Sequence, residues 1–289
     1  MEVAQFIIQI LNGLSYGLLL FLLAAGLSLI FGLMGIINLA HGSYYMLGAY
    51  LGLTIMKTSA NFILALVGAA TLVALLGLIM ERVFFRGLYK QELDQVLLTF
   101  GFIYIFMDLA KYLWGGTPRS LPTPPLLEGS LEIFGAAFPV YRLALIVSGL
   151  AVALLLRLFL EKTRTGMIIR AGVDDKEMVT ALAINIKLYF SIIFALGAFL
   201  AAFGGVMGGP VIGAYPGLDF EILVLALAVV VVGGLGTLRG AFWGSILVGF
   251  IDTFSKALFP SFSMLTIYIA MALILILKPS GLLGRMELS

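Results

Sequence analysis

Stretches without a charged side chain follow one another along the sequence, separated by short polar segments. The charge-free stretches are residues 3–56, 58–80, 95–107, 143–156, 188–218, 222–238, 240–251 and 257–277. A helix needs about 20 mostly apolar residues to cross the hydrocarbon core of a membrane, and a charge at its centre costs roughly 2.5–3.5 kcal/mol. The first stretch is long enough for two or three crossings, so the pattern predicts about nine membrane spans, within a range of roughly eight to ten.

These stretches lack the alternation of apolar and polar residues that is typical of membrane β-strands. Because a backbone in lipid must satisfy its own hydrogen bonds, we expect them to be helices. The sequence therefore predicts an all-α, polytopic helical bundle that forms one transmembrane domain over residues 1–289. The composition agrees, because 11% of the residues are charged, against about 25% in a soluble domain. The apolar stretches recur to the end of the sequence, so no cleaved signal peptide is expected.

Basic residues indicate the orientation in the membrane. They gather in three regions: Arg82, Arg86 and Lys90; Arg157, Lys162, Arg164, Arg170, Lys176 and Lys187; and Lys278 with Arg285. By the positive-inside rule these regions face the cytoplasm, which places the C-terminus inside. Residues 115–141 and 209–220 then lie outside, and so does the N-terminus, where the only charge is Glu2. The predicted location is the inner (plasma) membrane of the cell.

The sequence contains no cysteine and a single histidine, His41. This excludes disulfides, thiolate catalysis, cysteine-built metal sites and multi-histidine metal sites. No Ser/His/Asp grouping lies near His41, and the sequence has no Gly-Lys dipeptide, so it cannot form a Walker A loop. We therefore predict a transport protein that is not an enzyme and that holds no metal or cofactor.

Two glycine-rich segments are candidates for a transport pathway. The first, "GLMGIINLAHG", places Asn38 and His41 at membrane depth, where polar groups either face the bundle interior or mark a broken helix. Broken helices often form substrate sites in transporters. The second, "VVGGLGTLRGAFWG", contains Gly234 and Gly236 and is denser in glycine than helix packing usually requires. The alternative is that both segments only hold neighbouring helices together.

The polar segment 161–187 differs from the other connections. Asp174 and Asp175 can cap a short helix from about Lys176 to Ala183, with acidic groups near its positive N-terminal end. Met178 and Leu182 give this helix an apolar face on the cytoplasmic side, which suggests docking into a groove on a partner. The alternative is a helix that lies on the lipid surface, although Asp174, Asp175 and Glu177 are poorly suited to anionic lipid.

Four separated motifs carry a resemblance to a known family. The segments "INLAHGSYYMLGAY", "RAGVDDKEMVTALAINI", "VVGGLGTLRGAFWGSILVG" and "KPSGLLGR" occur in the family's order over nearly the whole chain. Together they resemble the LivH-type permease subunits of ATP-binding cassette (ABC) importers for branched-chain amino acids, whose relatives also carry urea and short amides. The resemblance implies a fold like that of type II ABC importers, with a cytoplasmic coupling helix.

The resemblance also implies partners and site residues. The partners would be a LivM-like second permease, two cytoplasmic ATPase subunits, an external substrate-binding protein and membrane lipid, with no nucleic acid. Residues that match the pathway motif are Asn38, Ala40, His41 and Gly42, with Gly234 and Gly236 as further candidates. Residues that match the coupling segment are Asp174, Asp175, Glu177, Met178, Ala183 and Asn185. Family members usually have glycine where this chain has Ala183, which puts a sharp turn at that position in doubt.

A different class of transporter is the main alternative. In a self-sufficient secondary carrier or channel for a small polar solute, Asp108 or Asp252 would bind the coupling ion. Lys111 lies three residues after Asp108, and Lys256 lies four residues after Asp252. Each pair can therefore neutralise itself on one helix face. This spacing favours a permease that draws its energy from attached ATPases.

Overall fold

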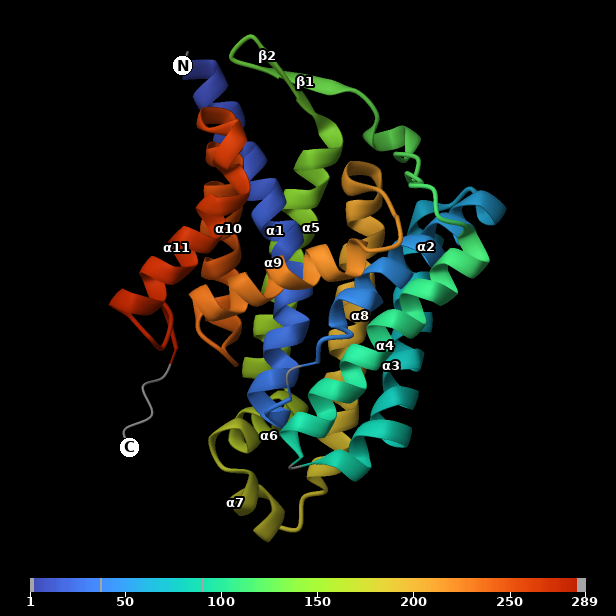
Figure 1. The fold of residues 1–289 in the computed structure, drawn as a ribbon, viewed down its shortest axis with the longest axis vertical. Coiled ribbons are helices and arrows are strands. Elements are labelled where there is room, and N and C mark those ends of the chain that lie inside the picture. The colour runs from blue at the N-terminus through green and yellow to red at the C-terminus, as the bar shows by residue number, and fades with distance from the viewer. Residues whose placement is uncertain (1–2, 37, 90, 285–289) are drawn as a thin grey trace.

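The computed structural model describes residues 3–36, 38–89 and 91–284, and it is almost entirely helical (Figure 1). The helices are α1 (Val3–Met34), α2 (His41–Ser59), α3 (Phe62–Met80), α4 (Glu92–Trp114), α5 (Val140–Lys162), α6 (Arg164–Asp174), α7 (Lys176–Ala181), α8 (Ile186–Ile212), α9 (Leu218–Gly233), α10 (Leu238–Leu258) and α11 (Ser263–Leu277). A π-helical turn, Glu81–Phe85, extends α3, and short 3₁₀ turns cover Arg86–Leu88, Pro125–Leu127 and Pro260–Phe262. The prediction of a polytopic helical bundle is confirmed.

One β-hairpin departs from the all-α prediction. Strands β1 (Ser130–Ile133) and β2 (Ala136–Pro139) pair antiparallel, with Ser130 opposite Pro139. Phe134 and Gly135 form the turn with φ of 50° and 81°, and two positive values are typical of the tight turns that suit a hairpin. The hairpin lies at the end of the bundle where α1 begins, and α6 and α7 lie at the opposite end (Figure 1). The sequence analysis placed residues 115–141 outside the membrane and predicted no strand there.

Each predicted span corresponds to a helix, but fewer helices than nine can cross a membrane by themselves. Among the described residues, five are long and apolar enough: α1, α3 with its extension, α4, α5 and α8. Helices α9 and α10 meet at an angle of 116° and together give a sixth span at most. Figure 1 shows α9 running across the long axis of the bundle. A charge-free stretch thus predicts a buried or lipid-facing helix, but not the direction in which it runs.

Helices α1 and α8 form the centre of the bundle. In α1, 89% of the most apolar window is buried inside the protein, and in α8 72%, against 22–28% in α3, α4 and α5. Helix α1 packs against α10, α8, α5 and α9, and α8 also contacts α2 and α3. The exposed apolar faces of α3, α4 and α5 are therefore left for lipid or for another membrane subunit.

Glycines allow the inner helices to approach closely. A Cβ at Gly48 of α2 would overlap the backbone of Ala202 in α8, and one at Gly249 of α10 would lie 2.5 Å from the Cα of Gly17 in α1. Small residues at helix interfaces are the usual means by which membrane helices pack tightly. For these glycines the structure supports the packing interpretation.

Candidate functional site

The break between α1 and α2 is where the sequence predicted a pathway element. Helix α1 ends at Met34, and Gly35 follows it with a φ of 70°. The amide of Gly35 donates to the carbonyl of Phe31, as a C-terminal glycine cap does. The chain then turns back into the bundle, and α2 begins at His41 (Figure 1). The break is confirmed for the described residues 35, 36 and 38–40.

His41 is fully buried against α1. Its Nε2 lies 3.1 Å from the carbonyl oxygen of Leu23, and a carbonyl can only accept, so Nε2 carries the proton and donates. Gly26 leaves room for the ring, because a Cβ there would lie 2.9 Å from Nε2. The Nδ1 atom has no hydrogen-bond partner among the described residues. His41 therefore links the start of α2 to α1, and its Nδ1 is an acceptor without a donor among the described residues.

Gly42 and Ser43 bring α2 against the start of α9. A Cβ at Gly42 would overlap the carbonyl oxygen of Asp219, so only glycine allows this approach. The Oγ of Ser43 donates to Oδ2 of Asp219 at 3.0 Å, and Asp219 is 1% exposed. Both α2 and α9 present their N-terminal ends here, and the positive end of a helix stabilises a nearby carboxylate. The sequence analysis missed Asp219, although an acid in the first turn of an apolar helix was visible.

Several buried polar atoms around the break lack partners. Asn38 is fully buried, and neither its side-chain oxygen nor its nitrogen makes a hydrogen bond of normal geometry with a described residue, although the hydroxyl of Tyr44 lies near it. Oδ1 of Asp219 and the hydroxyl of Tyr45 also lack a partner in the part of the chain that the structure describes. Each unpaired buried group costs roughly 1–3 kcal/mol, and native proteins contain few of them. Such a concentration marks a polar region that the described side chains and backbone do not fully satisfy.

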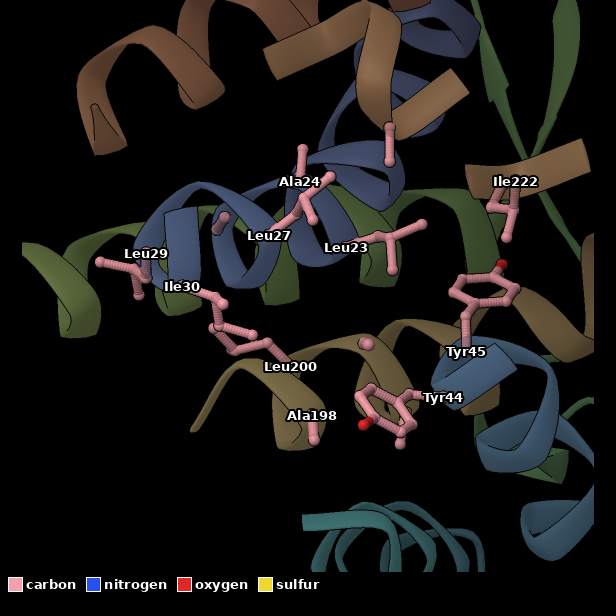
Figure 2. Close-up of a cluster of buried hydrophobic side chains, with 14 of the residues drawn as sticks. Leu23, Ala24, Leu27, Leu29, Ile30, Tyr44, Tyr45, Ala198, Leu200 and Ile222 are labelled. Carbon is pink, nitrogen blue, oxygen red and sulfur yellow. The ribbon is translucent and has the colours of Figure 1, made fainter. Parts of the chain in front are cut away.

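Apolar side chains surround the break and close it. Figure 2 shows Leu23, Leu27 and Ile30 of α1 on one side, and Tyr44 and Tyr45 of α2 on the other, with side chains of α8 between them. The residues predicted to line the pathway, Asn38, Ala40, His41 and Gly42, are all buried. In this conformation they face packed side chains.

The second glycine-rich segment forms the bend between α9 and α10. Gly234 and Gly236 have φ of 109° and 74°, values that other residues rarely adopt. A Cβ at Gly236 would lie 2.9 Å from the Cα of Gly32 in α1. His41 contacts α1 at Leu23, nine residues earlier, which is about 13 Å along a helix. The two predicted pathway segments therefore both contact α1, but at positions too far apart to form one site.

The predicted coupling residues form one local feature. Asp175 caps α7, with its Oδ1 accepting from the amide of Met178 at 2.9 Å, and Asp174 is the last residue of α6. Helix α7 ends at Ala181, two residues before the predicted end. Ala183 has a φ of 59°, so the sharp turn is made even without glycine. The carbonyl of Asn185 then accepts from the amide of Leu188 at 3.1 Å as α8 begins.

Helix α7 shows one face to the bundle and another to its surroundings. Val179 is buried, whereas Met178 and Leu182 are 59% and 67% exposed. The Nζ of Lys176 lies 5.9 Å from the ring centroid of Phe190 in α8. A Cβ at Gly35 would lie 3.8 Å from the same Nζ. The end of the Lys176 side chain therefore lies close to the first residue of the α1–α2 break.

A buried carboxylate near the α6–α7 end was not predicted. Glu81 is fully buried, and its Oε2 accepts from Oγ of Ser191 in α8 at 2.5 Å. Its Oε1 accepts from the hydroxyl of Tyr89 and lies 3.4 Å from Nε of Arg86. The only signal in the sequence was an acid placed between an apolar stretch and a basic cluster. We name Glu81, Arg86, Tyr89 and Ser191 the Glu81 cluster, and it fastens the end of α3 to α8.

A polar cavity was not predicted either. It has a volume of about 520 Å³ and lies between α1, α5, α8, α9 and α10. Four charged residues line it: Arg142, Glu221, Asp252 and Lys256. No residue pattern indicated a cavity, because these charges lie at the ends of apolar stretches, where interfacial charges are normal. The predicted Asp252–Lys256 pair is present, with 2.7 Å between Oδ2 and Nζ, and so is Asp108–Lys111 at 3.3 Å.

A bundle of apolar helices with a broken helix inside it and a short amphipathic helix at one end defines a multi-pass membrane permease. The chain belongs to the family described as "Branched-chain amino acid transport system / permease component", which it matches over residues 9–277.

Named relatives agree with this assignment. The chain is 28% identical over 298 residues to the high-affinity branched-chain amino acid transport system permease protein LivH of Salmonella typhimurium, covering 98% of this chain and 96% of that protein. It is 28% identical to the permease protein BraD of Pseudomonas aeruginosa, covering 99% and 98%. A probable LivH permease of Methanocaldococcus jannaschii is 28% identical, covering 91% and 82%.

Among solved structures, the chain is similar to "PsaBC from Streptococcus pneumoniae in complex with Fab". The TM-score is 0.49 and the sequence identity 14%, covering 92% of this chain and 89% of that one. This likeness is too distant to add to the fold described above.

Proposed function

We propose that this chain is the permease subunit of an ATP-driven ABC importer for branched-chain amino acids and forms half of the translocation pathway. The observation that carries the proposal is the family match over residues 9–277, together with relatives of the same length that are named as permeases for these amino acids. ATP hydrolysis is supplied by partner subunits, because the sequence has no Gly-Lys dipeptide for a Walker A loop.

The proposed assembly also contains a LivM-like second permease, two cytoplasmic ATPase subunits and an external substrate-binding protein. In this proposal the protein lies in the inner membrane of the cell. Helices α6 and α7 and the C-terminus are on the cytoplasmic side. Support comes from the basic residues that lie on and around these helices, among them Lys162, Arg164 and Arg170. The β1–β2 hairpin at the other end of the bundle then faces outside.

The coupling element in this proposal is α7 with its flanking turns. Met178 and Leu182 are exposed apolar side chains on a helix that caps itself through Asp175, which suits a groove on an ATPase. Glu177 adds a charge on the same exposed segment. The side chain of Lys176, the first residue of α7, ends close to Gly35, so in this proposal a displacement of α7 is passed on to the α1–α2 break.

The pathway in this proposal runs along α1. Asn38, Ala40, His41 and Gly42 border it at the break, and Gly234 with Gly236 border it at the α9–α10 bend. The polar atoms of Asn38, His41 and Asp219 that lack partners among the described residues support a break that changes its contacts during transport, because they are free to pair with substrate or with other groups.

Co-purification with the ATPases tests the proposal. We expect Met178→Glu and Glu177→Phe to abolish ATPase docking and leucine uptake while the permease still inserts in the membrane. Leu126→Glu serves as the matched control, because Leu126 is 91% exposed and lies outside α7. This variant should keep both ATPase docking and leucine uptake. Normal co-purification of the ATPases with both α7 variants would contradict the coupling role.

The alternative of an ion-coupled carrier rests on Asp108 and Asp252. Asp108 is paired with Lys111, and Asp252 with Lys256, so neither acid is left as an isolated binding group. Leucine uptake that stops on ATP depletion, but continues when the ion gradients are collapsed, supports the importer. The opposite result supports the carrier.

A further inference from the structure

The polar cavity adjoins the closed break on the side of the β1–β2 hairpin. Leu19 of α1 lines it, and the next turn of that helix carries Leu23, whose carbonyl holds His41. Leu218 of α9 also lines it, and the following residue, Asp219, packs on Gly42. The cavity therefore ends where the break begins. A solute entering from the hairpin end reaches this cavity before it meets His41 and Gly42.

The four charges that line the cavity are not all neutralised within the chain. Asp252 and Lys256 form an ion pair, so they cancel one another. Arg142 donates from its guanidinium to the side-chain oxygen of Asn12, and Glu221 accepts from the hydroxyl of Tyr215 at 2.6 Å. Neither Arg142 nor Glu221 forms a salt bridge with another described residue. The cavity thus offers one cation and one anion whose hydrogen-bond partners are neutral.

The rest of the lining combines aliphatic side chains with polar ones, among them Gln9, Asn12, Ser15 and Thr253. Its apolar side chains include Leu19, Leu145, Ile212, Leu218, Ile222 and Leu225. A volume of about 520 Å³ lies within the usual range for small-molecule sites. Such sites typically combine an apolar wall with a few polar groups that fix orientation.

We propose that this cavity binds the zwitterionic form of an aliphatic α-amino acid. Arg142 receives the carboxylate, since guanidinium groups match carboxylates in geometry and charge. Glu221 receives the ammonium group, and the aliphatic wall contacts the side chain. The proposal rests on the proposed function, and it assigns the charges of the substrate to two residues of this chain. Urea and short amides carry neither charge and would gain nothing from the Arg142–Glu221 arrangement.

Uptake kinetics give the first test, in proteoliposomes that contain the complete transporter with its binding protein and ATP. Arg142→Gln and Glu221→Gln should each raise the KM for leucine about tenfold or more, because each loses a charge-assisted contact with the substrate. Lys111→Gln, which removes a cation outside the cavity, should leave the KM unchanged. Wild-type KM values in both cavity variants would overturn the proposal.

Thiol protection gives the second test and does not depend on removing a charge. The chain has no cysteine, so Val211→Cys introduces the chain's single thiol at the cavity wall. In the nucleotide-free complex, leucine should slow its labelling several-fold. Leucinamide, which lacks the carboxylate, and 4-methylpentanoate, which lacks the ammonium group, should not. Labelling of Tyr112→Cys, at a position 87% exposed, should be the same with or without leucine.

The two levels of the proposal fail in different ways. If the wild-type complex does not take up leucine with ATP, the proposed function is wrong. If it does, but leucine leaves the labelling of Val211→Cys unchanged, or if urea protects this thiol as well as leucine does, the cavity is not a site for a zwitterion. Loss of leucine protection when Arg142→Gln is added to Val211→Cys supports the assignment of the carboxylate.

Discussion

Two polar clusters are buried in the bundle, and they differ in how completely their atoms are paired. Both carboxylate oxygens of Glu81 accept hydrogen bonds, from Tyr89 and Ser191. At the α1–α2 break, in contrast, the side chain of Asn38 and one atom each of His41 and Asp219 have no partner among the described residues. A fully paired cluster holds one arrangement, whereas an incompletely paired one lowers its energy by rearranging. Polar residues at membrane depth therefore belong either to fully paired clusters or to incompletely paired ones, and the sequence alone does not distinguish the two.

The largest effect should come from the paired cluster. Glu81→Ala removes the acceptor of Tyr89 and Ser191 and leaves Arg86 without its carboxylate. We expect a loss of about 3 kcal/mol in the free energy of unfolding, as when one partner of a buried charged group is removed. Denaturation of the purified chain in mixed micelles measures it. A change below about 1 kcal/mol would show that the cluster holds nothing in place, since even one net hydrogen bond is worth that much.

Gly42→Ala should have the next largest effect, because its methyl group would overlap the Asp219 backbone. Overpacking of this kind costs roughly 1–3 kcal/mol, so the melting temperature in detergent should fall. Gly101→Ala is the matched control, since nothing lies within 4 Å of a Cβ there, and alanine favours a helix by up to about 1 kcal/mol over glycine. An unchanged melting temperature for Gly42→Ala would mean that α2 and α9 are looser than described.

Asn38→Leu separates stability from transport at the break. Asn38 makes no side-chain hydrogen bond in this arrangement, so a similar apolar side chain should change the free energy of unfolding by less than about 1 kcal/mol or raise it. Leucine uptake should nevertheless fall strongly if the amide finds its partners in another conformation. Uptake at the wild-type rate, with the melting temperature also unchanged, would assign Asn38 to packing alone.

The smallest effect is expected outside the membrane, at Ala183. A left-handed backbone costs a residue with a Cβ roughly 1–2 kcal/mol, and glycine avoids most of this cost but loses more freedom on folding. Ala183→Gly should therefore stabilise the turn between α7 and α8 by less than about 1 kcal/mol. Hydrogen exchange of the amides at this turn should become slower. Faster exchange would show that the flexibility of glycine outweighs the relief of strain.

Most of the fold followed from the sequence because lipid penalises charge so strongly. Charge-free stretches gave the positions of the apolar helices, and Asp175 gave the start of α7. The direction of α9 was not predictable, since a stretch such as 222–238 is equally apolar whether it runs along the bundle or across it. The β1–β2 hairpin was missed because its strands are four residues long and their turn contains Phe134.

The candidate sites were predicted less completely. The break between α1 and α2 was visible because glycine, asparagine and histidine interrupt an apolar stretch, although His41 and Gly42, which were expected in the break, belong to the first turn of α2. Asp219 and Glu81 were not singled out, because their partners, Ser43 and Ser191, are more than 100 residues away in the sequence. The Arg142–Glu221 cavity depends on the packing of five helices that lie far apart in the sequence. A local pattern of residues contains no information about such distant contacts.

The central position of α1 has a consequence for biosynthesis. This helix is synthesised before the helices that bury it, α8 and α10, which follow more than 100 residues later. At about 5–20 residues per second, α1 spends many seconds in the bilayer with its glycine-lined surfaces against lipid chains. Its sequence must therefore be acceptable to two surroundings in succession: first a fluid hydrocarbon, in which close glycine contacts do not exist, and later a packed interior that requires them. A bulky apolar residue at Gly17 or Gly26 would be inserted normally and would be rejected only at assembly, so such variants should accumulate as inserted but protease-sensitive chains.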